Sequence, residues 1–257
     1  MRLIPMQRVR RLSNHFAPIV LRGFSETTDE ETWVKKGHEL GEVLSWALTG
    51  TIFKVVNSRD ESKDANNVTS NEPLPMHFDG VFKFTEKITD PATGAVTKVL
   101  NPPGYQYFTC IATAPKGDGY TLFCSSRLAF RYLPRPWSLE ALEPVTWKMI
   151  NDGFWSNEHR GHAASVAAPR RQASRASAGT RRGAGEQDQV LDFTVAMENA
   201  DQSLVQLVEK LTYDFRTCLR FSWERGDVLV NDNMAMLHTR TSYTSACDRE
   251  LWRIHLD

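Results

Sequence analysis

The sequence predicts a mainly β fold with flanking helices, and three observations support this prediction. Apolar runs such as Val228–Val230 and Leu251–Leu256 are short, as buried strands are, and turn residues bound the first of them. Tyr105–Thr113 alternates in polarity and is rich in aromatic residues, as expected of a core strand. The chain has 257 residues, which is enough for one domain with a sizeable core and is a common length for β-rich barrels.

Further elements follow from similar patterns. Asp29–Leu48 carries an apolar stripe at helical spacing, with Thr28 or Asp29 as its candidate N-cap. An insertion at Thr85–Pro103 contains a turn signature, with Ala95–Leu100 as the return arm of a hairpin. Other strands are predicted at Thr51–Val56, Thr121–Cys124 and Val190–Met197, and other helices at Ser126–Leu133, Ser138–Leu142 and Gln202–Leu211.

The composition excludes several classes of partner. Lysine and arginine number 31, as do aspartate and glutamate, so the formal net charge is +0 and no nucleic-acid partner is expected. No apolar run approaches the roughly 18 residues that span a bilayer, so no membrane span is expected. The four cysteines are widely spaced, which predicts free thiols and a cytoplasmic location. A small-molecule substrate is expected, and a homo-oligomer stays an open alternative.

Two histidines and one carboxylate form a candidate metal site. His77 and Asp79 lie two positions apart in Pro73–Phe84, so on an extended strand both side chains point to the same face. His238 lies far downstream, after the predicted strand Val228–Val230. Three such ligands on one side of a metal leave the other positions open, which is typical of non-haem Fe(II) enzymes that use oxygen.

Arg249 and Arg253 follow His238, and Arg253 lies inside an apolar strand-like run. A buried guanidinium is costly unless it meets an anion, so Arg253 is expected to bind one, on a strand neighbouring that of His238. An arginine can hold a planar carboxylate by two parallel bonds. Each of these residues alone has an ordinary explanation, such as a hydrogen-bonded histidine or a solvent ion pair. Their combination is what favours a functional site.

With these residues, the chain resembles the TauD/TfdA family of Fe(II)- and 2-oxoglutarate-dependent dioxygenases, from about Ile19 to its end. The resemblance implies a double-stranded β-helix (jelly-roll) core. It also implies that Fe(II) is held by His77, Asp79 and His238, with 2-oxoglutarate and O2 as co-substrates.

The resemblance further implies three residues that bind 2-oxoglutarate. Arg253 would pair with the far carboxylate of the co-substrate, and Arg249 would lie near the metal end of the site. Thr121, at the end of the turn Gly117–Thr121, matches the family's co-substrate threonine with one residue extra.

The substrate is implied less directly. The His77–Gly80 block and the aromatic strand most resemble PvcB-like, isocyanide-forming members from microbial and fungal natural-product pathways. This implies hydroxylation, desaturation or cyclisation of a small amino-acid-derived carboxylic acid, with Phe78, Phe82 and Arg249 as candidate contacts. Three alternatives stay open: a catabolic dioxygenase acting on sulfonates or aryloxyacids, a catalytically silent or damaged jelly-roll paralogue that binds metal only, and a zinc hydrolase. The hydrolase would leave Arg253 unexplained.

Residues 1–257 are interpreted as one domain with an atypical segment at Gly161–Gly185. This segment has no aromatic or acidic residue, and Val166 is its only bulky aliphatic residue, which is typical of a disordered basic linker. Alternatively, the run comes from a shifted reading frame or a misplaced splice boundary, and this possibility underlies the damaged-paralogue alternative. A transcript sequence across Glu158–Val190 decides between the two.

Overall fold

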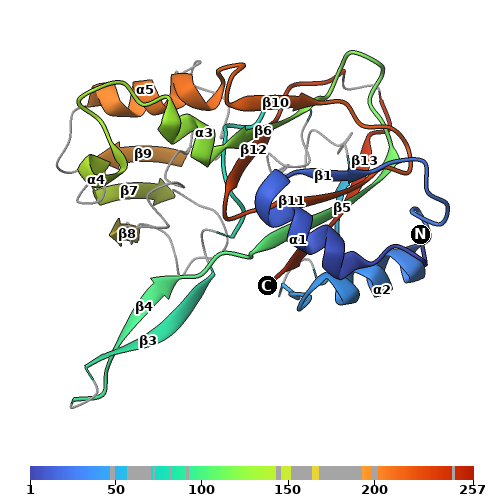
Figure 1. The fold of residues 1–257 in the computed structure, drawn as a ribbon, viewed down its shortest axis with the longest axis horizontal. Helices are drawn as coiled ribbons and strands as arrows, with labels where there is room; N and C mark the ends of the chain where they lie inside the picture. Colours follow the sequence, from blue (N-terminus) through green and yellow to red (C-terminus); the bar gives the residue numbers. More distant parts are fainter. Residues whose placement is uncertain are drawn as a thin grey trace, which may run out of the picture.

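Figure 1 shows a computed structural model of the chain, coloured from the N-terminus to the C-terminus. The structure describes residues 1–46, 50–56, 71, 73–80, 83–90, 93–142, 146–151, 164–167, 193–197, 202–244 and 247–257. Phe82 and most of Gly161–Gly185 lie outside these ranges, so the predictions made for them stay predictions.

Two antiparallel sheets form the jelly-roll core. The larger sheet has the strand order β1-β11-β5-β13-β2, and the smaller has the order β10-β6-β12. The larger sheet contains β1 Ile19–Leu21, β2 Phe53–Val56, β5 Tyr105–Ala112, β11 Val228–Asp232 and β13 Glu250–Leu256. The smaller contains β6 Thr121–Ser125, β10 Cys218–Phe221 and β12 Met236–Arg240. The strands predicted here are confirmed to within two residues at each end, namely Thr51–Val56, Tyr105–Thr113, Thr121–Cys124, Val228–Val230 and Leu251–Leu256. No bounds were predicted for β10 and β12.

Two helices, α1 (Met6–Phe16) and α2 (Glu30–Leu40), pack on the larger sheet. Trp33 of α2 is fully buried and stacks on Tyr107 of β5, with ring centroids 5.0 Å apart. Burying a side chain of this kind stabilises the fold by roughly 1.5–3 kcal/mol. The helix α1 was not predicted, because arginines conceal its short buried stripe of Met6, Val9 and Ser13.

The end of α2 differs from the prediction and affects the candidate site. Asp29 is the N-cap, as predicted, and its Oδ1 accepts a hydrogen bond of 2.9 Å from the amide of Thr32. The helix ends at Leu40 rather than Leu48, because the following residues run alongside the C-terminal strand. The amide of Leu44 donates to the carbonyl of His255 at 2.9 Å. This extended course brings Trp46 beside His255.

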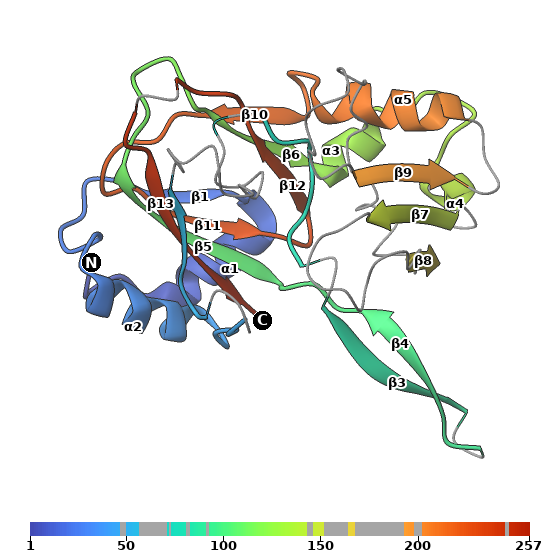
Figure 2. The same ribbon diagram turned by 180° about the vertical axis from the view of Figure 1, so that it is seen from behind.

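A second group of elements packs beside the smaller sheet (Figure 2). It contains α3 Ser126–Arg131, α4 Leu139–Leu142, α5 Gln202–Thr212 and a sheet of order β8-β7-β9, formed by β7 Thr146–Asn151, β8 Ala164–Ala167 and β9 Phe193–Met197. The buried side chains Leu142 and Leu204 join α4 to α5. Four residues of the atypical segment Gly161–Gly185 form the strand β8, and this strand pairs with β7.

The predicted hairpin is confirmed as β3 (Phe84–Asp90) and β4 (Ala95–Leu100). It extends away from the rest of the molecule as a two-stranded arm (Figures 1 and 2). No helix in the described part of the chain is long and apolar enough to cross a membrane. All four cysteines are free, as predicted.

Candidate metal centre

Backbone pairing holds His77 and His238 next to each other. The amide of His77 donates to the carbonyl of His238 at 2.9 Å, and the amide of His238 donates back at 2.8 Å. Side chains of such a directly paired couple project from the same side, and the two ring centroids are 4.3 Å apart. The predicted strand at His77 is therefore a single bridge to β12, the edge strand of the smaller sheet.

The hydrogen bonds of the two rings fix which ring nitrogen carries the proton. His77 Nδ1 lies 2.8 Å from the carbonyl oxygen of Pro75, which can only accept, so Nδ1 carries the proton. His238 Nε2 lies 3.1 Å from the amide nitrogen of Gln106, which can only donate, so this Nε2 accepts. Both rings therefore present an Nε2 lone pair, as a metal-binding histidine must.

Asp79 completes the group, and its backbone is held by Asn233. The amide of Asp79 donates to Asn233 Oδ1 at 3.0 Å, and Asn233 Nδ2 donates to the carbonyls of Asp79 and Pro103 at 3.1 and 2.8 Å. Gly80 follows with φ of +82°, where a Cβ atom would lie 2.2 Å from Pro103 Cδ. The turn after Asp79 therefore requires glycine for both its backbone angle and its close approach to Pro103.

Gly80→Ala is expected to lower the free energy of unfolding and weaken metal binding, because the added methyl group would displace Pro103 and the Asp79 turn. The left-handed backbone costs about 1 kcal/mol, and the overpacking adds about 1–3 kcal/mol. Gly94→Ala is the matched control, since Gly94 also has positive φ but has nothing within 4 Å of a Cβ atom. Denaturant unfolding of both variants measures the difference, and equal losses would contradict the close-approach explanation.

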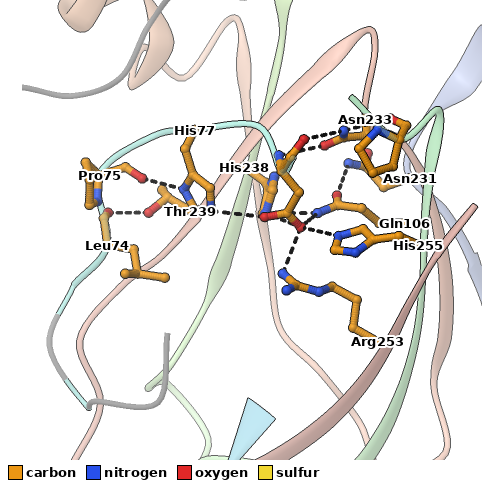
Figure 3. A network of polar contacts seen from close by, with 12 residues as sticks. Leu74, Pro75, His77, Gln106, Asn231, Asn233, His238, Thr239, Arg253 and His255 are labelled. Carbon is orange, nitrogen blue, oxygen red and sulfur yellow. Dashed lines mark hydrogen bonds and ion pairs between the residues drawn. The ribbon is translucent and has the colours of Figure 1, made fainter. Parts of the chain in front are cut away.

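The carboxylate of Asp79 receives three donors from the larger sheet (Figure 3). Arg253 Nη1 lies 2.7 Å and His255 Nε2 lies 2.8 Å from Asp79 Oδ2, and Gln106 Nε2 also donates to this oxygen. His255 and Gln106 are register partners on β13 and β5, and Arg253 lies two residues before His255 on the same face. The three donors therefore converge from neighbouring strands.

The electrostatics keep the rings neutral and the carboxylate charged. Burial lowers the pKa of His238 to about 3, and burial also lowers the pKa of His77. Burial would raise the pKa of Asp79, but the charge of Arg253 and the hydrogen bond from His255 outweigh it and hold this pKa well below its usual range. At neutral pH the site thus presents two neutral imidazoles and one carboxylate.

These three residues fit a divalent metal. One ligand atom from each of His77, Asp79 and His238 lies within 4.8 Å of the others. His77 Nε2 is 3.8 Å from Asp79 Oδ1, and His238 Nε2 is 3.8 Å from Asp79 Oδ2. Two histidines and one carboxylate that leave further positions open are the ligand set of non-haem Fe(II) oxygenases. The structure thus brings together the three residues that the sequence singled out.

The two arginines lie toward different ends of β13, and the 2-oxoglutarate contacts predicted for them stay predictions. Arg253 contacts Asp79 and is therefore at the metal end, and its guanidinium also lies over the ring of Phe53, 5.0 Å from the centroid. Arg249 lies just before the other end of β13, next to Glu250, which pairs with Ala112. Gln106, which contacts Asp79, pairs instead with His255. The expected adjacency of the strands of His238 and Arg253 is wrong, since β12 and β13 belong to different sheets.

Arg249 and Thr121 both keep donors available. Arg249 is buried, and among the described residues its guanidinium has no hydrogen bond or ion pair. Burial lowers its pKa, and the ring of Tyr243 lies 5.4 Å away. Gly119, two residues before Thr121, would place a Cβ atom 3.6 Å from Arg249 Cδ. Thr121 Oγ1 accepts a hydrogen bond of 2.7 Å from the indole of Trp223, which leaves its own proton to donate.

Of the three predicted substrate contacts, the structure describes Phe78 and Arg249. Phe78 is buried in a core cluster with Met76, Cys124 and Leu237, so it supports the fold. Phe82 lies outside the described residues.

Sequence reasoning missed His255, Gln106 and Asn233. His255 carries a signal in the sequence, because its position two residues after Arg253 places both on one face of the strand. Gln106 and Asn233 carry a weaker signal in the sequence, since each is only a polar residue within or shortly after a predicted strand. Both side chains are fully buried in the structure. Only the tertiary structure shows that all three converge on Asp79.

Comparisons with known proteins identify the family and the fold. The sequence model of the family described as "Taurine catabolism dioxygenase TauD, TfdA family" matches residues 4–255. The structure of the PvcB protein from Pseudomonas aeruginosa superposes with a TM-score of 0.64 at 19% identity, covering 99% of this chain and 81% of that one. An asparagine oxygenase superposes with a TM-score of 0.61 at 15% identity, covering 98% and 77%.

Among curated proteins, isocyanide synthase xanB of Aspergillus fumigatus is 53% identical over 262 residues, covering 99% of this chain and 33% of that protein. Isocyanide synthase A of the same organism is 33% identical, covering 99% of this chain and 42% of its own length. The tyrosine isonitrile desaturase of Pseudomonas aeruginosa is 22% identical, covering 98% and 81%. The chain thus spans less than half the length of each of the two Aspergillus fumigatus relatives. Because the family match extends over nearly all of its residues, the chain belongs to the TauD/TfdA dioxygenase family.

Proposed function

We propose that this protein is an Fe(II)- and 2-oxoglutarate-dependent dioxygenase that oxidises a C–H bond of a small, amino-acid-derived acid in secondary metabolism. The observation that carries the proposal is the grouping of His77, Asp79 and His238, with both imidazoles presenting an unprotonated Nε2. The three residues would hold Fe(II), with His77 and His238 bonding through Nε2 and Asp79 through Oδ1. Bound iron supplies the site at which O2 oxidises 2-oxoglutarate to succinate and carbon dioxide while a substrate C–H bond is oxidised.

The remaining residues bind and orient the co-substrate. We assign the far carboxylate of 2-oxoglutarate to Arg249 and Thr121, which is a reversal of the two arginine roles implied by the resemblance. Arg249 is the buried guanidinium without an anionic partner in the described part of the chain, and such a group favours an incoming carboxylate. Arg253 already has an anion in Asp79, so its role is at the metal end.

The names of the relatives support the substrate class. The curated relatives include isocyanide synthases and tyrosine isonitrile desaturases, so a carboxylic acid derived from an aromatic amino acid and bearing an isonitrile group is the first substrate to test. Sulfonates and aryloxyacids are the alternative class.

The free thiols support a cytoplasmic location, and the family match over residues 4–255 supports a single domain.

Succinate formation tests the function. The protein is incubated in air with Fe(II), 2-oxoglutarate and one of three candidate substrates: the isonitrile of tyrosine, taurine or an aryloxyacetate. We expect succinate in proportion to oxidised isonitrile acid, measured by mass spectrometry. Equal or faster oxidation of taurine or aryloxyacetate would favour the catabolic alternative. Absence of succinate with all three, together with intact metal binding, would favour the silent paralogue.

We also propose a homo-oligomer that forms through the hairpin arm. One face of the arm carries three cross-strand pairs of β3 and β4, namely Phe84–Leu100, Glu86–Lys98 and Ile88–Val96. Phe84, Ile88 and Val96 are 44%, 63% and 52% exposed. A two-stranded hairpin is marginally stable alone, and a second copy packed on this face about a two-fold axis would place each Glu86 against a Lys98.

Charge exchange on the arm tests this contact. Glu86→Lys and Lys98→Glu should each weaken self-association at least about tenfold, because like charges would meet across the two-fold axis. The double exchange should restore association, since the opposite charges meet again. Sedimentation analysis measures all four proteins. A wild-type protein that stays monomeric at all concentrations, or a double variant no better than the singles, would contradict the proposed interface.

A further inference from the structure

We propose that His255, held in one tautomer by Trp46, is a positioning residue that keeps Asp79 bound to the metal through a single oxygen. This inference rests on the proposed metal centre and concerns the geometry of its carboxylate ligand. It assigns a role to two residues, on β13 and on the extended segment after α2, that are not themselves metal ligands.

The tautomer of His255 follows from its two contacts. The indole Nε1 of Trp46 lies 2.9 Å from His255 Nδ1, and an indole nitrogen can only donate. Nδ1 must therefore accept, and the single proton of the neutral ring lies on Nε2. Nε2 is 2.8 Å from Asp79 Oδ2, so the imidazole donates to the carboxylate. The Trp46 ring also meets the imidazole edge-on, with centroids 5.5 Å apart, which restricts its orientation.

The donors divide the two oxygens of Asp79. Oδ2 accepts from His255, Arg253 and Gln106 and lies 3.8 Å from His238 Nε2, whereas Oδ1 lies 3.8 Å from His77 Nε2 and accepts no hydrogen bond among the described residues. A carboxylate offers about four lone-pair sites, two on each oxygen, so the three donors more than fill Oδ2. Only Oδ1 then keeps lone pairs for a metal. A carboxylate that bound through both oxygens would occupy a further metal position, and the proposed chemistry needs that position for 2-oxoglutarate or O2.

The three donors are not equivalent. Arg253 is long, and its Nε atom is buried without a hydrogen bond in the described structure, so its contact with Asp79 is braced less firmly. Gln106 also contacts His238 Nε2, and a metal at that nitrogen would displace this contact. His255 is buried and is fixed from behind by Trp46, so it is the most firmly held of the three donors on Oδ2.

Three variants separate hydrogen bonding from packing. In His255→Gln the side-chain amide reaches the position of the imidazole Nε2 and can still donate to Asp79. In His255→Asn the amide reaches only the position of Nδ1, so the donor to Asp79 is lost. Trp46→Phe keeps His255 but frees its tautomer. His38→Asn, on the exposed side of α2, is the matched control.

Each protein is titrated with Co(II), a spectroscopic substitute for Fe(II), and its visible absorption is recorded with and without 2-oxoglutarate. His255→Asn should weaken Co(II) binding by about 10- to 100-fold, as is typical when a partner of a metal ligand is removed, and change the spectrum. Trp46→Phe should weaken it by about fivefold, the value of one hydrogen bond. His255→Gln and His38→Asn should match the wild type.

The outcomes separate this inference from the metal centre itself. Wild-type affinity and spectrum in His255→Asn would overturn the positioning role, as would an equal loss in His255→Gln, since packing alone would then explain it. Unchanged binding in Trp46→Phe would overturn the tautomer argument. If instead the wild type and His238→Ala bind Co(II) equally, the metal centre fails, whatever the His255 variants show. Thermal unfolding of the metal-free proteins verifies that each variant is folded.

Discussion

Replacement of His77 or His238 by alanine is expected to abolish Fe(II)-dependent turnover of 2-oxoglutarate. Each variant leaves only two protein ligands, which are one imidazole and the carboxylate of Asp79. Arg253 also contacts this carboxylate, so the two ligands together cannot hold the ion. We expect metal affinity to fall more than the roughly 100-fold seen when a partner of a ligand is removed. Metal stoichiometry and succinate formation, measured on the same preparations, report the two effects.

The two variants differ in how strongly each is expected to disturb the fold, so comparing them separates loss of a ligand from misfolding. His238 is buried on β12, whereas the His77 side chain is 25% exposed and lies on a single bridge, so His77→Ala should disturb the fold less. His38→Ala, an exposed histidine on α2, should keep full activity. If a folded His77→Ala protein bound iron and produced succinate at the wild-type rate, His77 would not be a ligand.

Replacement of Arg249 by alanine is expected to raise the requirement for 2-oxoglutarate by about 30-fold or more without changing the affinity for iron. Truncating one partner of a buried charge pair costs about 2–5 kcal/mol, and each 1.4 kcal/mol is a factor of about ten. The apparent KM for 2-oxoglutarate and the affinity for Co(II) are measured separately. Arg225→Ala, an exposed arginine before β11, is the control and should change neither.

Arg253→Ala should give the opposite division, because Arg253 contacts a metal ligand. We expect weaker metal binding and only an indirect effect on 2-oxoglutarate. If Arg253→Ala raised the 2-oxoglutarate requirement far more than Arg249→Ala did, the roles implied by the family resemblance would hold and our reassignment would be wrong.

Much of the jelly roll could be predicted from the sequence, because its strands are short apolar runs between turn residues. Val228–Val230 and Leu251–Leu256 both lie within confirmed strands. The failures share a physical cause, which is that tertiary contacts override local pattern. The apolar stripe of Asp29–Leu48 continues past Leu40, yet the backbone of Leu44 pairs with the C-terminal strand instead. The few buried residues of α1 are hidden among exposed arginines.

The candidate site shows a similar division. His77, Asp79 and His238 could be found because spacing and residue type together are informative for a metal site. The surroundings of Asp79 could not, because Gln106, Asn233 and His255 act through side-chain hydrogen bonds between segments far apart in sequence. The order of the two arginines depends on which end of β13 faces the metal, and this requires the pairing register of β13 with β5.

The most direct test of the central claim is a crystal structure of the protein loaded with Fe(II) and 2-oxoglutarate without oxygen, with the iron located by its anomalous scattering. We predict a single ion bonded to Nε2 of His77, Nε2 of His238 and Oδ1 alone of Asp79, with 2-oxoglutarate chelating the ion and its far carboxylate on Arg249. Iron bound at another place, or a fourth protein ligand that closes the site to 2-oxoglutarate, would contradict the account.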